Sequence, residues 1–200
     1  MNPDSFEYYK YILCYVDNVM YISHNLQKPM KRIQENFKLK DNKIEPPDVY
    51  LGATLFKIKC DSGKYCCTIY PEQYVKAAVT SVEEVLARSG KRLLSKCVTL
   101  LLRNFSPWLE DSPELMEDGV QQYQELIGQL RWVVDIGRLE ILLETSLLSR
   151  YLDKPRVGHF KQAFHIFEYL KVHPKMNLGF DPAHPAIDEN RFQQCDWAEF

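Results

Sequence analysis

The sequence predicts an α+β fold, with β-hairpins in the first third of the chain and helices after them. Residues 8–15, 19–23, 50–58 and 65–70 are rich in aromatic and β-branched side chains, which is typical of strands. From Pro71 onward, apolar residues recur at helical spacing instead. Hydrophobic residues make up 46% and charged residues 26% of the 200-residue chain, a globular composition that excludes disorder throughout.

The first hairpin is expected between Phe6 and Ser23. Two strand-like runs, Tyr8–Tyr15 and Val19–Ser23, are separated by Asp17 and Asn18. Asp-Asn pairs favour tight turns because both residues tolerate a positive φ. The sequence therefore predicts an acidic residue at the tip of a hairpin.

A short helix and a second hairpin follow. Leu26–Phe37 has apolar residues at helical spacing, and Asn25 precedes it as a candidate N-cap. The basic residues of this region are Lys28, Lys31, Arg32, Lys38 and Lys40. They are candidates for phosphate contacts, although a charge run is more often a solvated face. Tyr50–Ile58 and Tyr65–Tyr70 are then expected to pair, because turn-forming residues separate them.

The remaining chain is predicted to be helical. Pro71–Ser89 is an amphipathic helix closed by Gly90, and Lys91–Ser112 is expected to be a long surface connection. Ser112 and Pro113 have the pattern of an N-cap and first helical residue. The other expected helices are Val120–Ile136, Arg138–Leu152 and Pro155–Lys171. They are predicted to pack through Leu126, Leu130, Leu143, Leu147, Phe160, Phe164 and Phe167. Residues 176–200 are expected to be irregular.

Charge and cysteine usage limit the possible functions. The net charge of −2 excludes a strongly basic nucleic-acid coat but leaves room for a local basic groove. The six cysteines form no Cys-x-x-Cys pair, and no Cys/His set has zinc-ligand spacing. Free, mostly buried thiols are expected, in a cytoplasmic or nuclear protein without a signal peptide or membrane span. The histidines at 159, 165, 173 and 184 are predicted to be packing or surface residues.

The one motif that suggests chemistry is Tyr15-Val16-Asp17-Asn18. A carboxylate held at the tip of a hairpin suits Mg²⁺, which prefers oxygen ligands. Phosphoryl-transfer enzymes hold two such ions about 3.5–4 Å apart. Taken alone, these four residues more often form an ordinary turn.

The motif and several later segments together resemble the reverse transcriptases of copia-type long-terminal-repeat retrotransposons. The similar segments, in order, are residues 15–24, 50–55, 72–76, 123–132, 148–152 and 159–171. The resemblance implies a partial palm over residues 1–70, a helical thumb- or connection-like region over 71–175, and a segment over 176–200 that leads toward an absent RNase H domain. It also implies an RNA or DNA template–primer as partner.

The resemblance assigns roles to individual residues. Asp17 would be the catalytic Mg²⁺ ligand, with Asn18 beside it at the other catalytic position. Tyr50, Leu51 and Gly52 would form the primer grip, where glycine lets the backbone approach the primer closely.

Two departures from the family pattern predict a loss of catalysis. First, Asn18 replaces the family's second Asp, so Mg²⁺ binding is expected to be weak. Second, no upstream acidic residue matches the family's other essential Asp. The chain is therefore expected to be an inactive C-terminal fragment of a polyprotein whose fingers and first palm half lie elsewhere. Two alternatives stay open: a non-catalytic helical module that binds nucleic acid or protein, and a remnant that makes no stable protein.

Overall fold

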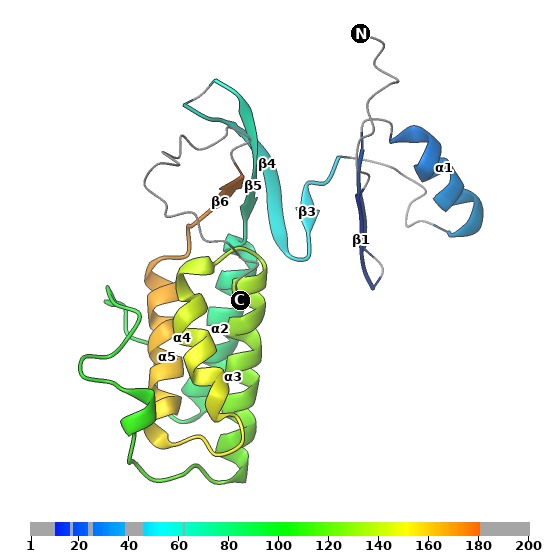
Figure 1. The fold of residues 1–200 in the computed structure, drawn as a ribbon. Helices are drawn as coiled ribbons and strands as arrows, with labels where there is room; N and C mark the ends of the chain where they lie inside the picture. Colours follow the sequence, from blue (N-terminus) through cyan, green and yellow to red (C-terminus); the bar gives the residue numbers. More distant parts are fainter. Residues whose placement is uncertain (1–10, 17, 24–25, 39–45, 62, 181–200) are drawn as a thin grey trace, which may run out of the picture.

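The computed structural model describes residues 11–16, 18–23, 26–38, 46–61 and 63–180. Within these ranges the chain is α+β, with two small antiparallel sheets and five α-helices (Figure 1). The strands are β1 Tyr11–Tyr15, β2 Asn18–Ile22, β3 Val49–Tyr50, β4 Ala53–Lys59, β5 Tyr65–Tyr70 and β6 Leu178–Phe180. The α-helices are α1 Gln27–Asn36, α2 Glu72–Arg88, α3 Glu117–Asp135, α4 Leu142–Leu148 and α5 Val157–Val172. Short 3₁₀ turns span Pro107–Leu109, Leu139–Ile141 and Ser149–Tyr151.

The first sheet is the predicted hairpin of β1 and β2. Its register pairs Tyr15 with Asn18, so Asn18 is the first residue of β2 and not part of the turn in which it was predicted. Val16 follows β1, and its φ of 53° lies in the left-handed region.

The second sheet has the order β3-β4-β5-β6. The expected single strand over Tyr50–Ile58 is wrong, because the chain reverses at Leu51 and Gly52. Both residues have a positive φ, 53° and 88°, which is the requirement of a two-residue hairpin turn. Residues 178–180, expected to be irregular, form β6 and pair with β5 at Ile69↔Leu178.

Helices α2 to α5 run side by side in a bundle that adjoins the second sheet (Figure 1). Each contributes apolar side chains to one core. The fully or almost fully buried members include Val75, Val82, Tyr123, Ile127, Leu130, Val133, Ile141, Leu148, Ile166, Phe167 and Leu170. Inside this core the Tyr123 hydroxyl donates a hydrogen bond to the Leu148 carbonyl, at 2.8 Å. Burying the apolar faces of four helices together is what stabilises this half of the molecule.

Two helix predictions are wrong in informative ways. Pro113 does not begin a helix, because its carbonyl accepts the Val157 amide at 3.0 Å while Leu115 N–H donates to Pro155 O at 2.9 Å. This short antiparallel bridge delays α3 until Glu117. The helix predicted over 138–152 divides into two 3₁₀ turns flanking α4. As a result the expected core residue Leu143 is 64% exposed.

The connection between α2 and α3 is more than a surface loop. Leu93 and Cys97 are 2% and 4% exposed. Polar side chains of α5 satisfy the backbone of this connection: Gln162 accepts from Leu102 N–H at 2.9 Å and donates to Leu100 O at 2.7 Å. Because these partners lie about 60 residues away in sequence, the lack of local periodicity in the connection does not reveal its burial.

Candidate functional site

The predicted catalytic motif lies at the tip of the first hairpin. Asp17 lies outside the described residues, and for Asn18 only the backbone is described. Val16 at the tip is 91% exposed and has a positive φ, which is strained for a β-branched residue. The Tyr15 ring lies 5.3 Å from the Trp132 ring of α3, measured between centroids. This ring contact links the end of β1 to α3.

Both faces of this hairpin are apolar and exposed. Side chains alternate between the two faces of a strand, so Tyr11, Leu13 and Tyr15 share one face of β1 and Ile12 lies on the other. Their exposed fractions are 57%, 38%, 47% and 54%. Among the described residues, no strand other than β1 and β2 belongs to this sheet. Exposed apolar faces on a two-stranded sheet are typical of a surface that further structure covers.

The predicted primer-grip residues form the tight turn between β3 and β4. Tyr50 ends β3, while Leu51 and Gly52 make the turn. A Cβ added to Gly52 would lie 3.3 Å from Cδ2 of Tyr74 in α2. Two features therefore favour glycine at this position: the positive φ of the backbone and the close approach of the Tyr74 ring. The two predicted sites therefore belong to different sheets.

Helix α1 presents the predicted basic residues to solvent. Lys28, Lys31 and Arg32 are exposed and line a hollow of about 390 Å³ together with Gln27 and Glu35. Lys38 is exposed just after the helix, and Lys40 lies outside the described residues. Three cations on one short helix offer point charges to a phosphate backbone.

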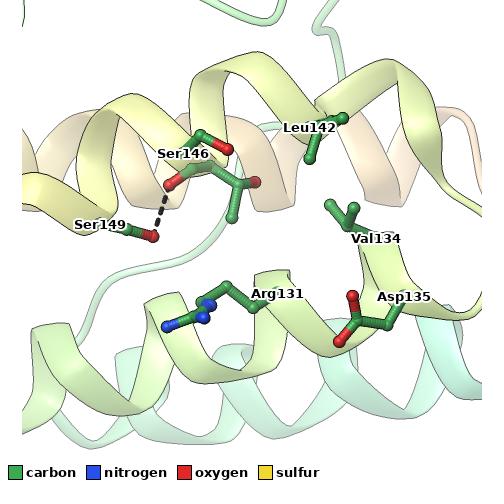
Figure 2. Close-up of a pocket in the computed structure, with 7 residues that line it drawn as sticks. Arg131, Val134, Asp135, Leu142, Ser146 and Ser149 are labelled. Carbon is green, nitrogen blue, oxygen red and sulfur yellow. Dashed lines mark hydrogen bonds between the residues drawn. The ribbon is translucent and has the colours of Figure 1, made fainter.

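A second hollow, of about 350 Å³, separates α3 from α4 (Figure 2). Arg131 and Asp135 line it from α3, and Ser146 and Ser149 line it from the opposite side. Ser149 Oγ donates a hydrogen bond to the Thr145 carbonyl at 2.7 Å. The Thr145 hydroxyl itself is buried without a hydrogen-bond partner among the described residues. Sequence patterns did not indicate this cleft, because its residues are common helix-surface types.

The histidines divide into two kinds. His159 is 1% exposed and stacks on Tyr151, with ring centroids 4.1 Å apart. It accepts a hydrogen bond from the Arg156 amide at Nδ1 and contacts Pro107 O at 2.9 Å through Nε2, so it is a packing histidine, one of the two roles predicted for the group. His165, by contrast, lies in a group with Cys97 and Glu168 whose potential ligand atoms are all within 4.8 Å of one another.

The Cys97–His165–Glu168 group was not predicted, because the sequence showed no cysteine and histidine at zinc-ligand spacing. Cys97 and His165 are 68 residues apart in sequence, which no short spacing rule covers. The only local signal was a histidine followed by a glutamate three residues later, which places both on one face of a helix. Burial raises the pKa of the Cys97 thiol, so the sulfur is a neutral thiol near pH 7 unless a cation lies beside it. By comparison, Cys66 is buried while its neighbour Cys67 is exposed, as expected for adjacent strand residues.

The hairpin motif does not fit the Mg²⁺ pair that the family resemblance implies. Asp17 supplies one carboxylate, and Asn18 supplies a neutral amide. A pair of divalent ions needs more anionic oxygen than this donor set carries. Any two-metal chemistry would depend on carboxylates beyond this hairpin.

Comparison with known proteins gives one significant sequence match. The chain is 27% identical over 174 residues to the Saccharomyces cerevisiae protein described as "Putative transposon Ty5-1 protein YCL074W". The aligned region covers 85% of this chain and 51% of the yeast protein, so the chain spans about half the length of the curated relative it matches. No family model and no solved structure matches significantly. The match supports a transposon origin for the chain. Within the described residues, no helix has the length and apolar character needed to cross a membrane.

Proposed function

We propose that the chain is a reverse-transcriptase-like segment of retrotransposon origin that contacts an RNA or DNA template–primer duplex without polymerising on its own. The observation that carries the proposal is the Tyr15–Asn18 motif at a strained, exposed hairpin tip. Val16 keeps a positive φ at 91% exposure, and such strain is concentrated at functional sites. The similarity to a yeast transposon protein supports the origin.

The arrangement of the other elements supports duplex contact. The Leu51–Gly52 turn exposes backbone next to α2, and α1 carries three exposed cations. Phosphates would bind the cations, and the glycine turn would lie against a sugar–phosphate strand. The apolar faces of β1 and β2 would be covered by further palm strands of the same polymerase fold.

Catalysis is the step that this hairpin does not complete. Asp17 with Asn18 carries one negative charge, so we expect only weak binding of Mg²⁺ there. In the assay, templated nucleotide incorporation is measured for the chain, for Asn18→Asp, and for Asn18→Asp joined to an upstream palm half from an active relative. Incorporation is expected only in the joined variant, and Asp17→Ala should abolish it. Incorporation by the unmodified chain alone, lost in Asp17→Ala, would contradict this account.

Duplex binding is tested by fluorescence anisotropy with a labelled RNA template–DNA primer. A triple variant, Lys28→Ala with Lys31→Ala and Arg32→Ala, should bind at least about 10-fold more weakly. The slope of the logarithm of its binding constant against the logarithm of salt concentration should become shallower by roughly 2–3, because each lost phosphate contact contributes about 0.9 to this slope.

The matched control removes an equal charge from a different basic cluster. Arg88, Lys91 and Arg92 are exposed at the end of α2, roughly 25 Å along the helix from its start beside the sheet. Their triple alanine variant should retain wild-type affinity. Equal weakening by both triple variants would show that net charge alone governs binding and would contradict the assigned interface.

A protein-interaction module is the second candidate, and one observation favours it. Leu139, Leu142 and Leu143 are 49%, 49% and 64% exposed just before and at the start of α4, and Leu142 lines the cleft of Figure 2. This candidate predicts self-association in sedimentation experiments that Leu143→Glu abolishes. A monomeric wild-type protein with micromolar or tighter duplex affinity would instead favour the first candidate.

A further inference from the structure

The Cys97–His165–Glu168 group lies where the α2–α3 connection crosses α5. His165 and Glu168 are one turn apart on α5 and therefore share a face of the helix. Cys97 comes from the connection and is 4% exposed. Its sulfur lies 3.8 Å from Nδ1 and 3.6 Å from Nε2 of His165. A thiol, an imidazole and a carboxylate thus meet at one partly buried point.

The imidazole of His165 has polar partners on both sides. The Thr99 hydroxyl donates to Leu101 O at 3.0 Å, and its oxygen lies 3.4 Å from Nε2 of His165. On the other side of the ring, Nδ1 lies 3.2 Å from Glu168 Oε2. In the tautomer with the proton on Nε2, the Nδ1 lone pair and the carboxylate oxygen face the same space, where a bound cation would lie.

The other two donors are also held in place. Glu168 Oε1 accepts the Leu94 amide at 3.1 Å, which leaves Oε2 toward the histidine. His173 Nε2 lies 3.2 Å from the Cys97 carbonyl and fixes the backbone of the cysteine. Such surrounding hydrogen bonds, including the one from the imidazole to Thr99, are what metal-ligating side chains in proteins usually have.

Two of the three ligand separations are close to those of a tetrahedral zinc site. Zinc lies about 2.3 Å from sulfur, about 2.0–2.1 Å from imidazole nitrogen and about 2.0–2.2 Å from carboxylate oxygen. Tetrahedral angles then place sulfur and nitrogen about 3.6 Å apart, and nitrogen and oxygen about 3.4 Å apart. The corresponding separations here are 3.8 Å from Cys97 Sγ to His165 Nδ1 and 3.2 Å from Nδ1 to Glu168 Oε2, while Sγ and Oε2 lie within 4.8 Å of each other. Because Sγ is almost equally far from Nδ1 and Nε2, the imidazole ring would turn to direct Nδ1 at the ion.

We propose that Cys97 Sγ, His165 Nδ1 and Glu168 Oε2 bind a zinc ion. One thiolate with one imidazole and one carboxylate suits Zn²⁺ better than Mg²⁺, which prefers oxygen alone, or Cu⁺, which prefers sulfur. Binding converts the Cys97 thiol to a thiolate and releases its proton to solvent, while any proton on Nδ1 is released as well. Water occupies the fourth position, because three protein ligands leave a tetrahedral site open.

The consequence of zinc binding would be a cross-link between two segments far apart in sequence. The connection over residues 89–116 has little regular structure of its own and is held to α5 by side-chain hydrogen bonds. A zinc ion would add a stronger tie at Cys97, in the first third of this segment. Zinc would therefore stabilise the helical bundle independently of any activity at the hairpin.

Cobalt substitution and thermal unfolding test the proposal with the full chain. Co²⁺ added to the reduced, metal-free protein should give the near-ultraviolet thiolate-to-cobalt charge-transfer band and the visible bands of tetrahedral cobalt. Zn²⁺ should displace the cobalt and raise the melting temperature. Cys97→Ser should lose the charge-transfer band, and Thr99→Val should weaken zinc affinity about 10-fold by releasing the imidazole from its hydrogen bond.

Matched variants make the outcome decisive. Cys66 is as buried as Cys97, at 4% exposure, so Cys66→Ser controls for loss of a buried thiol and should keep the band. Glu168→Gln retains an acceptor for the Leu94 amide but loses the charge, and it should bind zinc more weakly while remaining folded by circular dichroism. Absence of the band in the wild-type protein, or its persistence in Cys97→Ser, would overturn the proposal. Zinc affinity unchanged in Glu168→Gln would also overturn it.

Discussion

Arg138 is a fully buried cation, and its replacement by methionine tests how much its buried hydrogen bonds stabilise the helical bundle. Its side chain is 0% exposed and lies in the connection between α3 and α4. Nε donates to the Glu140 carboxylate, and one terminal nitrogen donates to His173 O at 2.8 Å. Methionine is of similar length but donates no hydrogen bond. Arg138→Met therefore leaves a carboxylate and a carbonyl without their buried partner.

The expected cost follows from these contacts. Removing one partner of a buried ion pair typically costs about 3–5 kcal/mol, because the other charge stays desolvated. For a chain of this size each kcal/mol lowers the melting temperature by about 2–4 °C, so the expected fall is roughly 6–20 °C. Urea unfolding followed by circular dichroism measures the loss directly. Hydrogen exchange should also show earlier opening at Leu178 in β6, which lies just beyond the carbonyl that Arg138 holds.

A milder substitution provides the control for Arg138. Glu140→Gln keeps an oxygen that accepts from Arg138 Nε and leaves the bond to His173 O in place. Glu140→Gln should lower the free energy of unfolding by only about 1–2 kcal/mol, which is the difference between a charged and a neutral hydrogen bond. If Arg138→Met changed the free energy of unfolding by less than about 0.5 kcal/mol, the buried contacts of Arg138 with Glu140 and His173 O would not stabilise the fold, and this prediction would be wrong.

Three further substitutions, two of them with a control variant, test the core, the Leu51–Gly52 turn and the buried tyrosine. Phe167→Ala, at a fully buried position, should cost about 3–5 kcal/mol in urea unfolding, whereas Leu143→Ala, at 64% exposure, should cost under about 0.5 kcal/mol. Gly52→Ala should lower the free energy of unfolding by about 1–3 kcal/mol, and by more than Gly90→Ala does. Both glycines have a positive φ, but a Cβ would meet a neighbouring ring at Gly52 and not at Gly90. Burial raises the pKa of Tyr123 above the 10.0 of a free tyrosine, so the folded state binds its proton more tightly and loses stability as the pH rises above about 10. Tyr123→Phe should accordingly be about 1 kcal/mol less stable than wild type at pH 7, and that gap should narrow above pH 10; a constant gap would contradict the assignment.

Local patterns predicted most helices and hairpins because local chemistry determines them. Apolar spacing located α1, α2, α3 and α5 to within a few residues, and the confirmed hairpins follow from β-branched and aromatic runs. Helix α4 was mispredicted, since Leu143 belongs to a continuous apolar run in which periodicity does not identify the buried face. Glu144 and Thr145, which are not among the predicted core residues, are buried instead.

Long-range partners explain the remaining differences. Pro113 has the signature of a helix start, yet it pairs with Val157 across more than 40 residues. For the same reason the sequence did not indicate the proposed zinc site, because Cys97 comes close to His165 only when the connection packs on α5. The motif around Asp17 was visible in sequence because all four of its residues are contiguous. Its chemical role still rests on the family resemblance.

The most direct test of the central claim is photochemical cross-linking from the primer terminus. A template–primer duplex with a photoreactive thiouridine at the primer 3′ end is bound to the chain and irradiated, and the cross-linked peptides are identified by mass spectrometry. The proposed function predicts cross-links to the hairpin at Tyr15–Asn18 and to the turn at Tyr50–Gly52, both suppressed by excess unlabelled duplex. Cross-links confined to α5, or a pattern that competitor duplex does not suppress, would contradict the assignment of these residues to a primer-binding site.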